Sequence, residues 1–318
     1  MNGGKKNRGD REPEQTCIQK GFFTALPFLL PSLVGFLVFS ILPMLTSMAV
    51  SFTEWGGLKK LTLFSDIGAF FGDYGIGFEN YAAILKSREF WQVLVHTLYF
   101  CALYLPVMLA VSIGVAVILN SKMKGVGVFR VVYYIPVLTS WVAGALIWRW
   151  VLSPDYGVVN SILGFFGIEG PKWLYDKYLA MPSIVMASVW KDLGYFGLIF
   201  LGGLQTIDPA VYEAASVDGA GRWRQFFKIT LPLLTPFIFF VVIIALMNSF
   251  QIFPQVVIMT GGGPNGATEV LVERIYTYAF SYKMMGYASA YSWILFFIIF
   301  IFTMLQFKFQ RKWVNYDR

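Results

Sequence analysis

Residues 205–253 read QTIDPAVYEAASVDGAGRWRQFFKITLPLLTPFIFFVVIIALMNSFQIF, a polar segment followed by a long apolar one. Its second half, from about Pro232 to Phe253, contains no charged side chain. A helix that crosses a bilayer needs about 20 mostly apolar residues, because each residue advances about 1.5 Å through a hydrocarbon layer about 30 Å thick. The first half is polar and rich in small residues. A membrane-spanning helix is therefore preceded here by a loop that has a structure of its own.

Five further stretches are long and apolar enough to cross a membrane. They cover about 25–51, 91–119, 131–152, 182–204 and 288–309, and 232–253 completes a set of six. The composition agrees, because 57% of the 318 residues are hydrophobic and only 14% are charged, too few to cover a soluble domain. The sequence predicts an all-α integral membrane protein with six transmembrane helices over residues 21–309. We expect a disordered polar tail over residues 1–20 and a short tail over 310–318.

Lysine and arginine are distributed unevenly between the two sets of loops. Fifteen of them fall in the tails and in the loops on the same side, and eight fall in the three loops on the other side. Because cytoplasmic loops carry the excess of these residues, both termini are predicted to be cytoplasmic. The net charge of +7 is thus explained by topology, which argues against a nucleic-acid partner.

The N-terminus and the cysteines argue against a cleaved signal peptide, a structural disulfide and a metal site. The first apolar stretch is too long for the hydrophobic region of a signal peptide, so we interpret it as an uncleaved span. Cys17 and Cys101 are not placed for a structural disulfide, and no metal-ligand spacing occurs. Between spans, residues 79–86 and 158–166 are each predicted to form a short external helix.

The loop over residues 205–231 is predicted to form two short helices joined by a turn. Asp208 before Pro209 is a favourable helix start, since the carboxylate accepts from free amides and proline presets the backbone. Asp218-Gly219 ends this helix, because glycine permits the turn and Asp218 can cap the next helix, from about residue 220 to Pro232. Spacing alone leaves open whether this unit binds another protein or lies in the lipid headgroups.

Several motifs in the chain resemble those of a known family. Glu213-Ala214-Ala215, followed by Gly219 and then Ile229, Leu231 and Pro232, resembles the EAA signature of the permease subunits of ABC importers. The resemblance extends over nearly the whole chain and indicates the carbohydrate-importer branch, on the side of the first of two unlike permeases. It includes the segments Leu30-Pro31 with Phe36 and Pro43, Ser51-Phe52-Thr53, Phe78-Glu79-Asn80-Tyr81, Phe90-Trp91 with Thr97, and Thr260-Gly261-Gly262-Gly263-Pro264. His96 stands where this branch usually has Asn, and Pro254 where it usually has Asp.

This resemblance implies a role for the cytoplasmic loop and a set of partners. In such importers the EAA loop forms a coupling helix that docks on an ATPase. The residues that would shape this docking site are Tyr212, Glu213, Ala214, Ala215, Asp218, Gly219 and Arg222. The implied partners are a second, similar permease subunit, two ABC ATPase subunits, an external solute-binding protein, a carbohydrate and membrane lipid. The chain has no phosphate-binding GxxxxGK[ST] motif, so ATP and Mg²⁺ would bind to the partner ATPases and no cofactor or catalytic residue is expected here. The implied location is a bacterial or archaeal cytoplasmic membrane.

The candidate substrate-lining residues are polar and aromatic side chains within the third, fourth and fifth spans. Buried hydroxyls and amides in a membrane either join helices or line a polar path. By the resemblance, these three spans hold the carbohydrate, and the candidates are Thr139, Ser140, Trp141, Trp190, Asp192, Asn248, Ser249 and Gln251. Lys191 and Asp192 lie about 14 Å deep, where a charge is costly and must face protein or water. The sequence leaves open whether they form a structural ion pair or contact substrate.

Two alternatives keep a membrane transporter but change its mechanism or substrate. An ion-coupled secondary carrier would need coupled carboxylates within the spans and would have no reason to keep the EAA spacing. An ABC importer of an anionic solute, such as a glycerophosphodiester, would favour embedded cations, and Lys191 and Arg149 leave this open. His96 is the only histidine, and without companions at its depth it is predicted to pack between helices rather than to relay protons.

Overall fold

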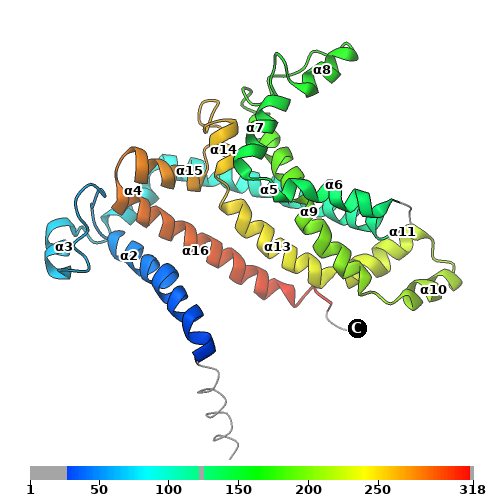
Figure 1. Cartoon of the computed structure of the whole chain (residues 1–318), viewed down its shortest axis with the longest axis horizontal. Helices are drawn as coiled ribbons and strands as arrows, with labels where there is room; N and C mark the ends of the chain where they lie inside the picture. The colour runs from blue at the N-terminus through cyan, green and yellow to red at the C-terminus, as the bar shows by residue number, and fades with distance from the viewer. Residues whose placement is uncertain (1–26, 122–124, 316–318) are drawn as a thin grey trace, which may run out of the picture.

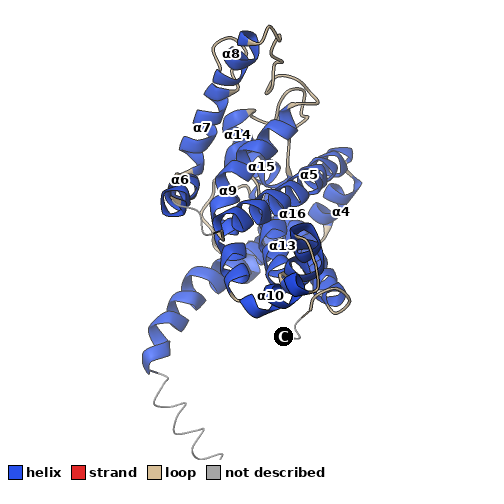
Figure 2. Cartoon of the chain, turned by 90° about the vertical axis from the view of Figure 1, so that its right-hand side faces the viewer, coloured by secondary structure: helices blue, strands red, loops and turns tan. Residues whose placement is uncertain are grey.

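A computed structural model describes residues 27–121 and 125–315. Within these ranges the regular structure is helical, and the only extended pairing is an isolated bridge between Thr53 and Gly75. Figure 2 shows helices joined by loops. The predicted all-α class is therefore confirmed. The tail expected over residues 1–20, Cys17 and the last three residues of the C-terminal tail lie outside the described residues.

Within the described residues, four continuous helices are long and apolar enough to cross a membrane. They are Pro27–Val50, α5 (Arg88–Leu119), α9 (Ala180–Gln205) and α16 (Met285–Gln310). The first of them contains η1 (Leu37–Ile41) and α2 (Leu42–Val50). Each coincides within a few residues with one of the stretches expected from hydropathy. Pro106 lies inside α5, and the helix continues past it, as membrane helices allow where neighbours satisfy the backbone.

The other two expected spans are bent pairs of helices. Residues 131–152, expected as one helix, form α6 (Val126–Leu138) and α7 (Trp141–Val151), which meet at 103°. Residues 222–233 comprise α11 (Arg222–Gln225), η2 (Phe226–Thr230) and α12 (Leu231–Leu233), and meet α13 (Thr235–Phe250) at 65°. The expectation of one uninterrupted third helix was wrong. Hydropathy reports apolar length, and it does not report a change of direction within that length.

Helix α9 lies at the centre of the described chain. It packs against α5, α6 and α13, and most of its apolar window is buried, unlike that of the other three continuous spans. Phe196 and Phe200 are completely buried. Because lipid is as apolar as these side chains, the packing is stabilised mainly by close van der Waals contact. Close contact needs small residues, and α9 provides several glycines.

Short helices surround the ends of the long ones. They are α3 (Ile67–Tyr74), α4 (Glu79–Lys86), α8 (Val158–Phe165), α14 (Pro254–Met259), α15 (Leu271–Tyr276) and η3 (Thr277–Ser281). The helices expected at 79–86 and 158–166 are confirmed. In Figure 1, α3, α4 and α15 lie at the left end of the long helices, whereas α10 (Pro209–Val217) and the C-terminal end of α16 lie toward the lower right. These three short helices and the 205–231 loop are thus at opposite ends of the molecule.

Helix α2 and the turns before it project away from the rest of the described chain (Figures 1 and 2). The apolar window of Pro27–Val50 has no buried residue, and α2 packs against α16. The large side chains of this segment are therefore exposed, as expected of a helix whose surroundings are lipid or protein rather than water.

Candidate functional site

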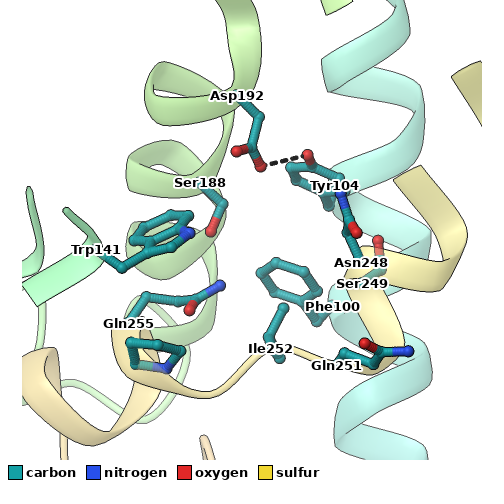
Figure 3. Close-up of a pocket in the computed structure, with 11 residues that line it drawn as sticks. Phe100, Tyr104, Trp141, Ser188, Asp192, Asn248, Ser249, Gln251, Ile252 and Gln255 are labelled. Atoms are coloured by element: carbon teal, nitrogen blue, oxygen red, sulfur yellow. Dashed lines mark hydrogen bonds between the residues drawn. The ribbon is translucent and has the colours of Figure 1, made fainter. Parts of the chain in front are cut away.

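A cavity of about 270 Å³ opens between α5, α7, α9 and the α13–α14 connection (Figure 3). Its lining is mostly polar or aromatic, although all of these elements lie in or beside apolar spans. The lining residues are Phe100, Tyr104, Trp141, Ser188, Asp192, Asn248, Ser249, Gln251, Ile252, Pro254 and Gln255. Polar groups that no apolar neighbour can satisfy require water or a solute.

Five of the eight residues expected from the sequence line this cavity together. They are Trp141, Asp192, Asn248, Ser249 and Gln251. The other three do not line it. The Thr139 hydroxyl donates to the carbonyl of Pro136 (2.7 Å), and that of Ser140 caps α7. Trp190 lies edge-on against Trp148, with ring centroids 5.9 Å apart.

Asp192 is the only charged residue in the lining. The Tyr104 hydroxyl, from α5, donates a hydrogen bond of 2.7 Å to its Oδ2 atom. A carboxylate held by one donor keeps its other oxygen as an acceptor, so Asp192 can still receive a hydrogen bond from a ligand in the cavity. Figure 3 shows the pair at one end of the cavity, on the side away from Gln251.

Lys191 points away from the cavity. Its ammonium donates to the carbonyl oxygen of Val137 (3.0 Å) and lies 5.7 Å from the centroid of the Trp141 ring. Neither Lys191 nor Asp192 has an ion-pair partner in the part of the chain that the structure describes. The two neighbours therefore do different things: Lys191 binds a helix end, and Asp192 lines the cavity.

The sequence reasoning missed several lining residues, of which Gln255 is the most informative. This side chain comes from α14, is 4% exposed, and its Oε1 atom has no hydrogen-bond partner among the described residues. Figure 3 places its amide between Trp141 and the rest of the cavity. A buried polar atom without a partner costs about 1–3 kcal/mol, so a ligand that donated to it would remove this cost. An amide directly after the break at Pro254 was the signal that could have identified it.

The loop over residues 205–231 has the predicted helix-turn-helix form. Asp208 caps α10 by accepting from the amide of Ala210 (2.9 Å), and Gly219 has φ +77° at the turn. The prediction that Asp218 caps the second helix was wrong. That helix starts after Gly221 without a side-chain cap, and Gln225 instead bridges the turn by donating to the Ala220 carbonyl (3.0 Å).

The residues expected at an ATPase docking site divide into two groups. The Tyr212 hydroxyl lies 3.0 Å from that of Thr230 and joins α10 to η2, so it supports the loop from within. Ala215 is half-buried, and five residues are exposed: Glu213, Ala214, Asp218, Gly219 and Arg222. The same surface exposes three large apolar side chains, Val217, Trp223 and Phe227, and Trp223 stacks on Phe227. Such exposed apolar groups are typical of a surface that contacts another protein or the membrane.

A charged cluster joins the N-terminal end of α5 to the segment that follows the glycine loop. Arg274 donates to Glu89 and lies 3.8 Å from Glu269, and the Tyr278 hydroxyl donates to Glu89 (2.7 Å). Burial, and then the Glu89 carboxylate, raise the pKa of Tyr278, so its hydroxyl remains a donor. His96 lies 3.3 Å from the carbonyl of Glu269, consistent with the predicted packing role.

A second cavity of about 270 Å³ lies beyond the first along α14. Arg149, Tyr175 and the loop from Thr260 to Pro264 form part of its wall. Arg149, the other cation within an apolar stretch, thus lines the outer cavity and not the one that holds Asp192.

These features define a class of protein: a helical membrane protein with a polar cavity between its spans and an exposed helix-turn-helix loop at one end. Residues 75–315 match the family described as the inner membrane component of binding-protein-dependent transport systems. The chain belongs to this family. Among relatives, it is 35% identical to the probable ABC transporter permease YesP of Bacillus subtilis, over 98% of each chain. It is 33% identical to the trehalose/maltose permease MalF of Thermococcus litoralis, over 89% of this chain and 92% of that one.

Solved structures share the fold. The chain superposes on a subunit of a bacterial ABC transporter that imports the acidic polysaccharide alginate with a TM-score of 0.79. The superposition covers 95% of this chain and 100% of that one at 22% identity. Among the sequence relatives, the lactose permease LacF of Rhizobium radiobacter is 30% identical to this chain, over 90% of this chain and 93% of that one.

Proposed function

We propose that this chain is one of two permease subunits of a heteromeric ABC importer and translocates a neutral carbohydrate. An external binding protein would deliver the sugar, and two ATPase subunits that bind ATP and Mg²⁺ would drive the cycle through the α10–α12 loop. The relatives named for trehalose/maltose and lactose transport support the substrate class. The observation that carries the proposal is the cavity itself, since aromatic rings beside amides, hydroxyls and a carboxylate suit a sugar.

The charges argue for a neutral solute rather than an anionic one. A phosphodiester in this cavity would face Asp192 without a cation in its lining, because Lys191 binds Val137 and Arg149 lines the outer cavity. Two like charges in a medium of low dielectric repel strongly. Sugar hydroxyls, in contrast, can donate to the carboxylate and accept from the amides.

The cavity is open on one side, which supports a second permease. Asn248 and Gln251 line it and remain exposed. We infer that the partner subunit closes this side and that ATP-driven movement of the docking loops alternates the side from which the closed site is reached.

Two serines on α9 give a matched test of the cavity. Ser183 and Ser188 are both buried and both donate to the carbonyl four residues earlier, but only Ser188 lines the cavity. We expect Ser188→Ala, Asn248→Ala and Asp192→Asn to weaken sugar uptake by the reconstituted complex. The loss of one hydrogen bond corresponds to about 2- to 13-fold, and to more at the carboxylate. Ser183→Ala should leave uptake unchanged.

Uptake is measured against sugar concentration and normalised to protein in the membrane. Unchanged kinetics in all three lining variants would refute the assignment of the cavity. The substrate itself is identified by loading the cognate binding protein with a panel of neutral and acidic sugars and recording which one stimulates ATP hydrolysis. Stimulation by acidic sugars alone would contradict a neutral substrate.

We further infer cytoplasmic termini, as the lysine and arginine distribution predicts. Val217 is 88% exposed in the docking loop, and Tyr175 is 61% exposed in the segment between α8 and α9. In a background without native cysteines, Tyr175→Cys should react with an impermeant thiol reagent in intact cells, and Val217→Cys only after permeabilisation. The reverse pattern would invert the topology.

A further inference from the structure

Backbone groups on both sides of the break in the third span are hydrogen-bonded. The carbonyl of Pro136, near the end of α6, accepts from the amide (3.2 Å) and hydroxyl (2.7 Å) of Thr139. The Ser140 hydroxyl accepts from the amide of Ala143 at the start of α7 (3.2 Å). The carbonyl of Val137 is satisfied from outside the span, by the ammonium of Lys191. Unpaired carbonyls at a helix end would be costly in a membrane, so these hydrogen bonds stabilise the bend.

Lys191 contacts both sides of this break. Its ammonium lies at the C-terminal end of α6, where the helix dipole is negative, and 5.7 Å from the ring of Trp141, the first residue of α7. A cation over an aromatic face is attracted to it, more strongly where water is excluded. Lys191 is 7% exposed, so both interactions are shielded from solvent. One group therefore ties the end of α6 to the beginning of α7.

The packing of α6 on α9 shows why this tie sets the position of Trp141. Gly194 and Gly197 follow Lys191 at intervals of three residues, and both glycines lie against Tyr133 of α6. A Cβ atom at Gly194 would lie 2.8 Å from the carbonyl oxygen of Tyr133, so α6 is in close contact with α9 at this point. With α6 clamped there, the direction of α7 depends on the contacts at the break. Trp141 is the α7 residue that lines the cavity.

We propose that Lys191 is a positioning residue for substrate. Its ammonium fixes the bend between α6 and α7 and thereby holds the Trp141 ring in the cavity wall. The absence of a carboxylate partner among the described residues fits this role, because the ammonium interacts with a carbonyl dipole and a ring. The functional consequence rests on the proposed function, whereas the structural one does not.

The position of Trp141 can be measured directly. The complex is labelled with 5-fluorotryptophan, and the ¹⁹F resonance of Trp141 is assigned by its loss in Trp141→Phe. We expect Lys191→Met to shift or broaden this resonance. Lys191→Arg, which keeps a cation and a donor, should largely preserve it. Arg149→Met is the matched control, because it removes the other embedded cation without contact to the break, and should leave the resonance in place.

Uptake by the same complexes tests whether Lys191 acts through Trp141. We expect Lys191→Met to reduce uptake by about 13-fold or more, the lower limit for the loss of one hydrogen bond to a charged group, and Trp141→Ala by at least as much. Uptake by the double variant should be no lower than that of the single variant with the lower uptake. Partial rescue by Lys191→Arg is also expected, and it excludes a loss due only to misfolding.

The outcomes separate the two claims. An unchanged Trp141 resonance in Lys191→Met overturns the proposal, and so do uptake losses that multiply in the double variant. If Trp141→Ala leaves uptake unchanged, the assignment of this cavity as the sugar site of the proposed function is refuted. The ¹⁹F resonance still decides whether Lys191 positions the Trp141 ring.

Discussion

The close contact between α6 and α9 predicts a large effect from one added methyl group. In Gly194→Ala, the new Cβ would lie 2.7 Å from Cγ2 of Val137, 2.8 Å from the carbonyl oxygen of Tyr133 and 3.0 Å from Cα of Tyr134. Two of these atoms belong to the backbone, so a rotamer change cannot relieve the contact and α6 must move. Overpacking of this kind costs about 1–3 kcal/mol.

Gly202→Ala is the matched control on the same helix. No atom lies within 4 Å of a Cβ placed at Gly202, so this variant gains helix propensity without a clash, about 1 kcal/mol at most. The thermal midpoint of the detergent-solubilised protein measures both. We expect Gly194→Ala to lower it by roughly 2–12 °C, since 1 kcal/mol corresponds to about 2–4 °C in a chain of this size. Equal midpoints for the two variants would refute the close contact on which the bend of the third span depends.

Two further predictions concern the ends of the molecule. Gly219→Pro should abolish binding-protein-stimulated ATP hydrolysis while the protein still inserts, because proline cannot adopt φ +77° or donate to the Ser216 carbonyl (3.1 Å). Gly221→Ala, at φ −68° in open space, should keep this stimulation, and full coupling in Gly219→Pro would contradict the docking role. Glu89→Gln should lower the free energy of unfolding by on the order of 1–3 kcal/mol, because it weakens the hydrogen bonds that Arg274 and Tyr278 donate to the carboxylate. The exposed Glu79→Gln is the control, and equal thermal midpoints for the two variants would show that the charged cluster is not stabilising.

Much of the fold follows from the sequence because apolar length and helix capping are local properties. The four continuous spans, the helix at Glu79–Lys86 and the cap at Asp208 lie where hydropathy and cap chemistry indicate. The bend between α6 and α7 could not be found in the same way. It depends on Lys191, more than 50 residues away in the sequence, whose ammonium satisfies a carbonyl that would otherwise lack a partner.

The candidate site was predicted in part for a related reason. Polar residues deep in a span must face protein or water, and this rule placed Asp192 and Asn248 correctly beside one cavity, although their contact with substrate stays a prediction. The same rule cannot distinguish a hydroxyl that lines a path from one that ends a helix. Thr139 and Ser140 were therefore grouped with the lining residues, while in the structure Thr139 follows the end of α6 and Ser140 caps the start of α7.

The neighbouring charges Lys191 and Asp192 connect the bend to the selectivity of the cavity. Successive residues on a helix point in directions about 100° apart, so one can bind α6 while the next faces α5 and the cavity. Because the ammonium is occupied by the Val137 carbonyl, the cavity keeps a carboxylate without a compensating cation from this chain. An opening of the bend that released Lys191 would move Trp141 and free an ammonium next to Asp192. The bend that the structure shows therefore gives a cavity suited to neutral hydroxyls. Its opening would change both the wall and the charge of the cavity.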